Sequence, residues 1–170
     1  GASAHWLTAS KILLATSNAA EVRIYHAANA DLAFDSMSGI SGDNYLSFSP
    51  STLSESEAAL VPHIKDSFAT YASDAELANI KAALKGELVA IAYSADGEML
   101  SATRVQIAKA LDDIYTSGDS DADEAMLGLV YTNDSITAKV WAPTAQSVEL
   151  QVFDSTKTLS STEKMALDDA

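Results

Sequence analysis

Cysteine is absent from this sequence of 170 residues, and basic residues are scarce. Without cysteine the chain can form no disulfide framework and no thiol or cysteine–zinc site. Ten Lys and Arg stand against 24 Asp and Glu, which gives a formal charge of -14 at pH 7. Because such an excess repels phosphate backbones and anionic membranes, we expect no nucleic-acid partner.

Long hydrophobic runs are also missing. The longest apolar run, at 88–93, is far shorter than the roughly 20 residues of a membrane-spanning helix and is typical of a buried strand. No basic stretch followed by an apolar segment opens the chain, so we expect no signal peptide within these residues. Hydrophobic residues still make up 48% of the sequence, which is enough for one large or two small domains.

What the sequence does contain is a series of short runs in which apolar and polar residues alternate. A period of two is typical of strands with one buried face, so we expect a mainly β protein. The expected strands lie at 5–7, 11–16, 21–26, 32–34, 45–48, 87–93, 99–107, 136–140 and 148–152. Asp96 and Gly97 favour a tight hairpin turn between two of them. The last two strands are expected to pair with each other across the turn at Pro143.

One helix is expected, over 74–85. Ser73 and Glu76 form a capping-box pattern, and apolar residues follow at helical spacing. Gly86 stands directly after the last helical residue, where glycine commonly ends a helix.

The segment 51–73 carries conflicting signals. Ser54 and Glu57 form a second capping-box pattern that would begin a helix. Pro62 would end that helix after two turns, because proline cannot continue it. We expect this segment to be irregular with some strand.

Residues 109–126 differ in composition from the rest of the chain. They are strongly acidic, and no basic residue after Lys109 balances the charge. Such a run is typical of a solvated linker. We therefore expect two domains, at 4–108 and 127–170, joined by this acidic linker.

Calcium binding in the linker is a weaker interpretation. The alternate acids resemble the start of a calcium loop, but the glycine and the bidentate glutamate that an EF-hand requires further on are missing. Solvated acids are the favoured interpretation. The calcium candidates are Asp119, Asp121 and Asp123, with Asp112 and Asp113 as further ones.

No self-contained active site can be recognised. A glycosidase needs two carboxylates fixed across the scissile bond, and the mere number of acids does not identify such a pair. The serines lack the Gly-x-Ser-x-Gly setting, and no glycine-rich phosphate loop is present. His5, His26 and His63 have no second ligand at metal spacing, so we assign them structural roles.

Sugar binding would use aromatic faces with polar groups at their edges. Trp6 and Trp141 are the candidates for such platforms. Trp141 is out of phase with the apolar face of its strand, so it could pack on a neighbouring domain as easily as on a glucan. For both residues a structural role is the favoured alternative.

The most specific signal is the run VWAPTAQSVEL at 140–150. With Leu127-Gly128 and the Asn133-Asp134 turn, it resembles the opening of the family 48 carbohydrate-binding module that precedes the catalytic barrel in debranching enzymes. Thr-Ala-Gln after Trp-Ala-Pro looks most like bacterial pullulanases. Four upstream segments resemble the all-β domain that pullulanases carry ahead of that module: AHW at 4–6, VRIY at 22–25, GELVAIA at 86–92 and ATRVQIAKALDD at 102–113.

The resemblance implies an immunoglobulin-like β-sandwich with one helix at 4–108 and a partial second β-sandwich at 127–170. A complete family 48 module needs about twice the residues that follow Leu127, because a β-sandwich runs to about 100 residues. Two or three strands with an open edge are marginal alone. We therefore expect 127–170 to dock on the first domain, to pair with another copy or to be poorly ordered.

The function implied is that of a non-catalytic N-terminal part of an enzyme that hydrolyses α-1,6-glucosidic bonds in pullulan, starch or glycogen. The implied partners are α-glucan and the downstream catalytic domain. No cofactor is expected in this part, whereas calcium is an expected ligand of the parent enzyme. The implied location is extracellular, cell-surface or periplasmic. One alternative is a scaffold or protein-interaction sandwich of a secreted protein without glucan binding, and another is an extracellular adhesin-type sandwich unrelated to starch.

Overall fold

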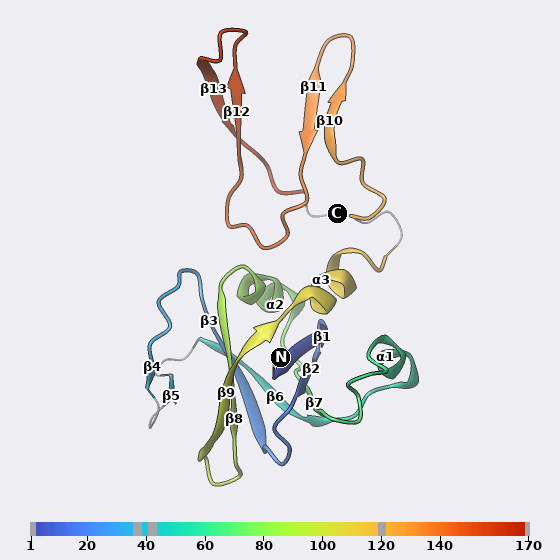
Figure 1. Ribbon diagram of the computed structural model, residues 1–170, viewed down its shortest axis with the longest axis vertical. Helices are drawn as coiled ribbons and strands as arrows, with labels where there is room; N and C mark the ends of the chain where they lie inside the picture. Colours follow the sequence, from blue (N-terminus) through green and yellow to red (C-terminus); the bar gives the residue numbers. More distant parts are fainter. Residues whose placement is uncertain (1–2, 36–38, 41–43, 119–121, 169–170) are drawn as a thin grey trace. The chain divides into compact units, whose positions relative to one another are not determined.

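The computed structural model describes residues 3–35, 39–40, 44–118 and 122–168, and the chain divides into two compact units, 1–117 and 118–170 (Figure 1). The strands of the first unit are β1 (Ala4–Thr8), β2 (Lys11–Leu14), β3 (Glu21–Ala27), β4 (Phe34–Asp35), β5 (Gly39–Ile40), β6 (Tyr45–Ser51), β7 (Ala69–Ala72), β8 (Glu87–Tyr93) and β9 (Met99–Gln106). Its helices are α1 (Glu55–Leu60), α2 (Leu77–Leu84) and α3 (Ala108–Tyr115). The second unit contains β10 (Gly128–Tyr131), β11 (Ile136–Lys139), β12 (Glu149–Phe153) and β13 (Leu159–Lys164). The mainly β prediction is confirmed.

Seven strands of the first unit close into a barrel in the order β1-β2-β7-β6-β3-β8-β9. The corner strand β6 pairs with β3 through 45–48 and with β7 through 49–51. The other corner strand, β9, pairs with β8 as far as Arg104 and with β1 from Val105, in the one parallel pair of the barrel. The two sheets of the predicted sandwich share both corner strands, so the sandwich closes into a barrel without an open edge.

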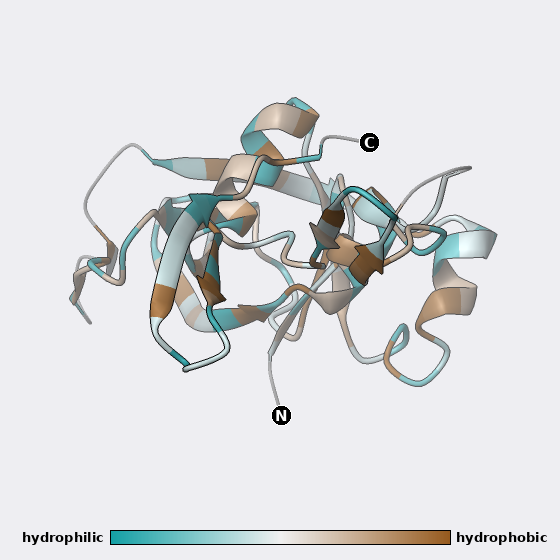
Figure 2. Cartoon of the chain, turned by 90° about the horizontal axis from the view of Figure 1, so that it is seen from above, coloured by the Kyte–Doolittle hydropathy of each residue, from teal (hydrophilic) through white to brown (hydrophobic). Residues whose placement is uncertain are grey.

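The core of the barrel is built from the inward face of each strand. Val22 and Ile24 of β3 lie beside Leu46 and Phe48 of β6, and all four side chains are buried. Polar residues lie between them, and hydrophobic and hydrophilic positions alternate along the strands in Figure 2. Because successive side chains of a strand alternate between its two faces, these polar residues point outward. Apolar residues of α2 and α3 are part of the same core.

Helix α2 begins three residues later than predicted. Ser73 accepts a hydrogen bond from the backbone N–H of Ala75 (3.2 Å), and Glu76, the N-cap, makes no side-chain capping bond. The expected capping box therefore does not form, and the helix starts at Leu77. The hairpin predicted around Asp96-Gly97 is confirmed, with β8 and β9 antiparallel.

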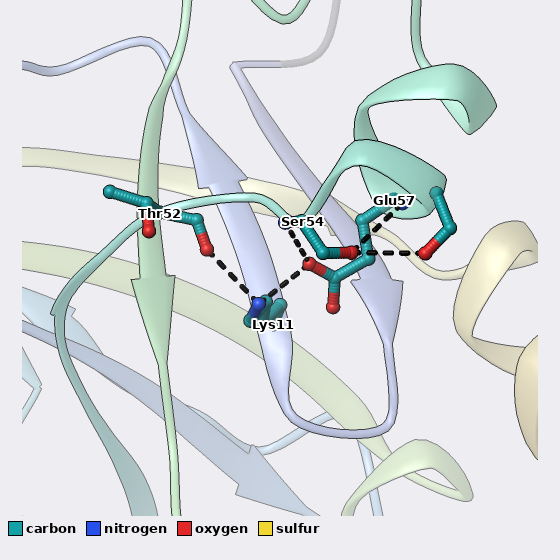
Figure 3. A network of polar contacts seen from close by, with 5 residues as sticks. Lys11, Thr52, Ser54 and Glu57 are labelled. Carbon is teal, nitrogen blue, oxygen red and sulfur yellow. Dashed lines mark hydrogen bonds and ion pairs between the residues drawn. The ribbon is translucent and has the colours of Figure 1, made fainter.

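The expectation of irregular structure with some strand at 51–73 is confirmed for the strand, which is β7, but it missed helix α1. The capping box between Ser54 and Glu57 forms completely, and it begins helix α1. The Lys11 Nζ atom on β2 lies 2.6 Å from the Glu57 carboxylate and 3.0 Å from the Thr52 carbonyl (Figure 3). This tertiary contact holds the first turn, and the helix ends at Leu60, with Val61 as its C-cap before Pro62.

The predicted linker is also corrected, because its first half is helical. Ala110 of α3 is fully buried against the barrel core. Asp113 accepts a hydrogen bond from the backbone N–H of Ala9, in the turn between β1 and β2 (2.8 Å). Residues 108–115 therefore belong to the first unit, and acidic composition alone was misleading.

The second unit consists of two hairpins, β10-β11 and β12-β13. The prediction that 136–140 pairs with 148–152 is wrong, since these segments lie in separate two-stranded sheets. Each strand instead pairs with its nearest neighbour in sequence, across the turns at 132–135 and 154–158. Closing a short loop costs less conformational entropy than closing a long one.

Candidate functional site

A cluster of polar and aromatic side chains lies on the outer face of β6, β3 and β8. The Arg23 Nη2 atom is 2.9 Å from the Glu21 carboxylate. The guanidinium carbon lies 4.6 Å from the ring centroid of Tyr45 and 4.8 Å from that of Tyr93. Ser47 donates to the other oxygen of Glu21 (2.7 Å). We call these five residues the Arg23 cluster.

Strand register brings the Arg23 cluster together. Arg23 is directly opposite Ser47 on β6, and Glu21 is directly opposite Tyr93 on β8. Because successive side chains alternate between the two faces of a sheet, these residues point away from the core that Val22 helps to form. The cluster is therefore positioned by backbone pairing on three neighbouring strands.

The electrostatics of the cluster favour the ion pair between Arg23 and Glu21, although the buried Arg23 Nε has no hydrogen-bond partner among the described residues. The hydrogen bond from Arg23 is the main cause of the lowered pKa of Glu21, so this carboxylate is ionised at pH 7. Burial, with a contribution from the Tyr25 hydroxyl at 3.2 Å, raises the pKa of Tyr93 to about 12. The cluster thus offers a carboxylate, a guanidinium and protonated hydroxyls beside two aromatic rings.

Sequence reasoning did not find this cluster. Glu21 and Arg23 are two residues apart in a predicted strand, so the sequence alone places their side chains on the same face of the sheet. The pairing of β3 with both β6 and β8 is not visible, because β8 lies about 60 residues further along the chain and non-local pairing leaves no local pattern.

The structure places Trp6 in the core. Its side chain is 0% exposed and packs edge-on against Phe48, with the ring centroids 5.8 Å apart and the planes at 88°. A stacked sugar needs an open ring face. Trp6 is therefore reassigned from candidate sugar platform to core residue.

Trp141 follows β11 and is 42% exposed. The neighbouring turn at Pro143 is closed by a hydrogen bond from the backbone N–H of Ala145 to the Ala142 carbonyl (3.0 Å). The apolar residues expected to form a buried strand face beside it are instead exposed, at 64% for Ile136 and 55% for Val140. Trp141 thus belongs to a surface rich in exposed apolar side chains.

The calcium candidates are only partly within the described residues. Asp119 and Asp121 lie outside them, and Asp123 is exposed. Asp112 is exposed as well, while the carboxylate of Asp113 accepts the hydrogen bond from Ala9. Across 3–35, 39–40, 44–118 and 122–168, no group of three or more His, Asp or Glu side chains could hold a metal ion.

The histidines occupy separate places. The His5 ring packs edge-on against Phe68, with centroids 5.3 Å apart. Burial lowers the pKa of His26, which favours its neutral form. His63 is exposed in the segment that follows α1. Within the described part of the chain, no helix is both long and apolar enough to cross a membrane.

Comparison with known proteins identifies the family. The model of the Pullulanase N2 domain matches residues 1–113. Pullulanase from Klebsiella pneumoniae is 35% identical over 99% of this chain, and pullulanase from Klebsiella aerogenes is 29% identical over 99%. Pullulanase 1, chloroplastic, from Arabidopsis thaliana is 25% identical over 54% of the chain. The chain therefore belongs to the Pullulanase N2 domain family. The matched residues include all strands of the barrel and most of α3.

Solved structures agree. The ligand-free crystal structure of PulA from Klebsiella pneumoniae has a TM-score of 0.87 and 35% identity, and the match covers 99% of this chain and 16% of that one. The maltotriose complex of PulA has a TM-score of 0.86 at 35% identity, with 99% and 18% covered. This chain spans about 15% of the length of the two Klebsiella pullulanases and corresponds to a non-catalytic N-terminal region of them.

Proposed function

We propose that the chain is the N-terminal part of a pullulanase-type enzyme that hydrolyses α-1,6-glucosidic bonds in pullulan, starch or glycogen. The observation that carries this proposal is the match over 99% of the chain to only 15% of the Klebsiella pneumoniae pullulanase. In this role the barrel positions the downstream catalytic domain. Deleting 1–117 from the whole polypeptide should raise its KM for pullulan or lower its melting temperature, and unchanged values for both would contradict the role.

The second unit is proposed to be the opening of a family 48 carbohydrate-binding module, within the expected range 127–170. Its apolar side chains support this, because they lie exposed on both hairpins where further strands could cover them. Among the most exposed are Leu129, Tyr131, Ile136, Val140 and Phe153. A complete sandwich would bury such side chains between two sheets.

Contact with α-glucan through Trp141 is a further part of the proposal. Support comes from its 42% exposure and from the maltotriose bound in a structure of a relative. In native gels containing pullulan, the wild-type chain should be retarded, and Trp141→Ala should lose that retardation. Phe153→Ala is the matched control, since Phe153 is a 54% exposed aromatic on the other hairpin. Equal mobility with and without pullulan would favour the scaffold alternative.

Calcium as a ligand of the parent enzyme stays a proposal, and so does weak calcium binding by Asp119, Asp121 and Asp123 in this chain, where solvated acids are the favoured alternative. Isothermal titration of the chain with calcium tests it, and a binding heat that Asp123→Asn removes would support it.

The extracellular, cell-surface or periplasmic location is likewise proposed, on the resemblance to bacterial pullulanases. The Arabidopsis relative is named chloroplastic, so fractionation of the producing cells is the direct test.

A further inference from the structure

We propose that the Arg23 cluster is a second saccharide subsite, which holds one or two sugar residues of a neutral glycan on the outer face of β6, β3 and β8. The inference rests on the proposed function only for the choice of α-glucan as the glycan. Its geometry lies wholly within the first unit and is independent of Trp141.

The cluster is accessible from solvent. The side chains of Arg23 and Glu21 are 32% and 30% exposed, and Ser47 is exposed. The other half of the same sheet face is covered, because Ile40 of β5 packs there with Tyr25 and Ile91. Tyr45 and Tyr93 are half-buried against this covered group, whereas Arg23, Glu21 and Ser47 are accessible among the described residues.

The groups present are those that recognise sugar hydroxyls. A carboxylate has about four lone-pair sites, of which Arg23 and Ser47 use two at Glu21. The remaining sites of Glu21 and the further N–H groups of Arg23 can bind neighbouring hydroxyls of one ring. Tyr45 and Tyr93 flank the guanidinium and are half-buried, so only their accessible part is aromatic surface for the C–H groups of a pyranose. Ser47 adds a hydroxyl at the rim.

Charge argues against an anionic ligand. The positive charge of Arg23 is already paired with Glu21, so the cluster carries no net charge. The chain as a whole carries -14, which disfavours phosphate and carboxylate groups. A neutral, hydroxyl-rich ligand is the class that meets both conditions.

Size argues against a protein partner. A stable protein interface involves about 20 to 30 residues on each side. The Arg23 cluster consists of five side chains from three strands, two of them half-buried, which matches one or two sugar rings. Rigid strands hold these side chains in place through direct cross-strand pairs, and such preorganisation limits the ordering cost of binding.

Titration of the isotope-labelled chain with maltotriose, followed by amide NMR shifts, tests this subsite. We expect saturable shifts at the amides of β3, β6 and β8, and a dissociation constant at least about tenfold higher in Arg23→Met. Lys81→Met is the matched control, because the Lys81 ammonium lies 5.0 Å from the Tyr115 ring centroid on a different surface. If Arg23→Met fails to fold, Ser47→Arg provides the second variant, since Ser47 is exposed and arginine there would occupy Glu21.

The outcomes separate this inference from the proposed function. Shifts confined to residues around Trp141 would overturn the subsite and leave the proposed glucan contact intact. Shifts on β3, β6 and β8 that Arg23→Met and Ser47→Arg do not weaken would also overturn it. Complete absence of shifts would overturn both glucan contacts, while pullulan hydrolysis by the whole polypeptide would still support the proposed enzyme.

Discussion

Trp6 shows how the same residue type can suggest a ligand platform in the sequence and a core residue in the structure. Its strand pattern gave no clear phase, since four of the five residues of β1 are hydrophobic or aromatic. The indole Nε1 is buried and has no hydrogen-bond partner among the described residues. Its stabilising effect therefore comes from packing against the barrel interior.

Trp6→Ala should lower the free energy of unfolding by about 3 to 5 kcal/mol, because it leaves a large cavity in the barrel. Trp6→Phe should cost much less, since it keeps the aromatic contact with Phe48 and removes an unpaired donor. Urea unfolding followed by circular dichroism measures both. Equal, small losses in the two variants would contradict the core assignment.

Glu57 links local capping to tertiary structure. Burial alone would raise its pKa, but hydrogen bonds from Lys11 and Ser54 outweigh that effect and lower it below 4.5. A carboxylate with a lowered pKa in the folded state stabilises the protein above its unfolded pKa, and that stability is lost as pH falls through the folded value. The stabilisation from Glu57 is therefore complete at neutral pH.

Glu57→Gln should cost about 1 kcal/mol at pH 7, because it removes the charge-assisted bond to Lys11. The difference from wild type should shrink as the pH falls below 4.5 and vanish once the wild-type carboxyl is protonated. Melting temperatures of both proteins between pH 7 and pH 3 measure this. A difference that persists unchanged at pH 3 would show that the ion pair is not its cause.

At the scale of elements, the local patterns predicted strands and the β8-β9 hairpin well, and the tertiary contacts explain the failures. Helix α1 forms because β2 supplies Lys11, a contact that is distant in sequence. Helix α3 was not predicted, because its acidic residues are typical of a linker. In the structure Asp112 faces solvent while Ala110 is buried. Likewise, the Arg23 cluster depends on non-local strand pairing that composition and periodicity do not encode.

Gly86 ends α2, as predicted, and the structure adds a second reason for glycine there. A Cβ atom at this position would lie 2.1 Å from the backbone oxygen of Ala27, which cannot move aside within β3. Gly97, by contrast, has open space around it and a φ of +81° in the β8-β9 turn. Glycine is required at position 86 because the backbone of Ala27 lies close to it, and at position 97 because φ is positive there.

Gly86→Ala should therefore destabilise the barrel by at least about 2 kcal/mol, since both backbones are fixed. Gly97→Ala should cost about 1 kcal/mol, the usual penalty for a left-handed alanine. Thermal unfolding of the two variants gives the comparison. A larger effect at position 97 than at position 86 would contradict the close approach.

At the scale of the whole molecule, buried residues are unevenly distributed between the two units. All described residues classed as buried belong to the first unit. The second unit is made of two separate hairpins, and isolated hairpins are marginally stable in water. The two units should therefore differ strongly in their resistance to local unfolding.

Amide hydrogen exchange should show this difference directly. We expect the barrel strands to be protected far more strongly than β10–β13, because protection follows burial and cooperative packing. The measurement should be made on a dilute sample, so that association of copies does not protect the hairpins. Equal protection in both units would contradict this account and point to docking of the second unit.

The central claim, that this chain is a non-catalytic part of a pullulanase-type enzyme, is tested most directly by hydrolysis of pullulan. The measurement compares the release of reducing ends by the whole polypeptide and by the 170-residue chain alone. The account predicts release by the whole polypeptide and none by the chain. Release by the chain alone, or a whole polypeptide that leaves pullulan intact, would contradict it.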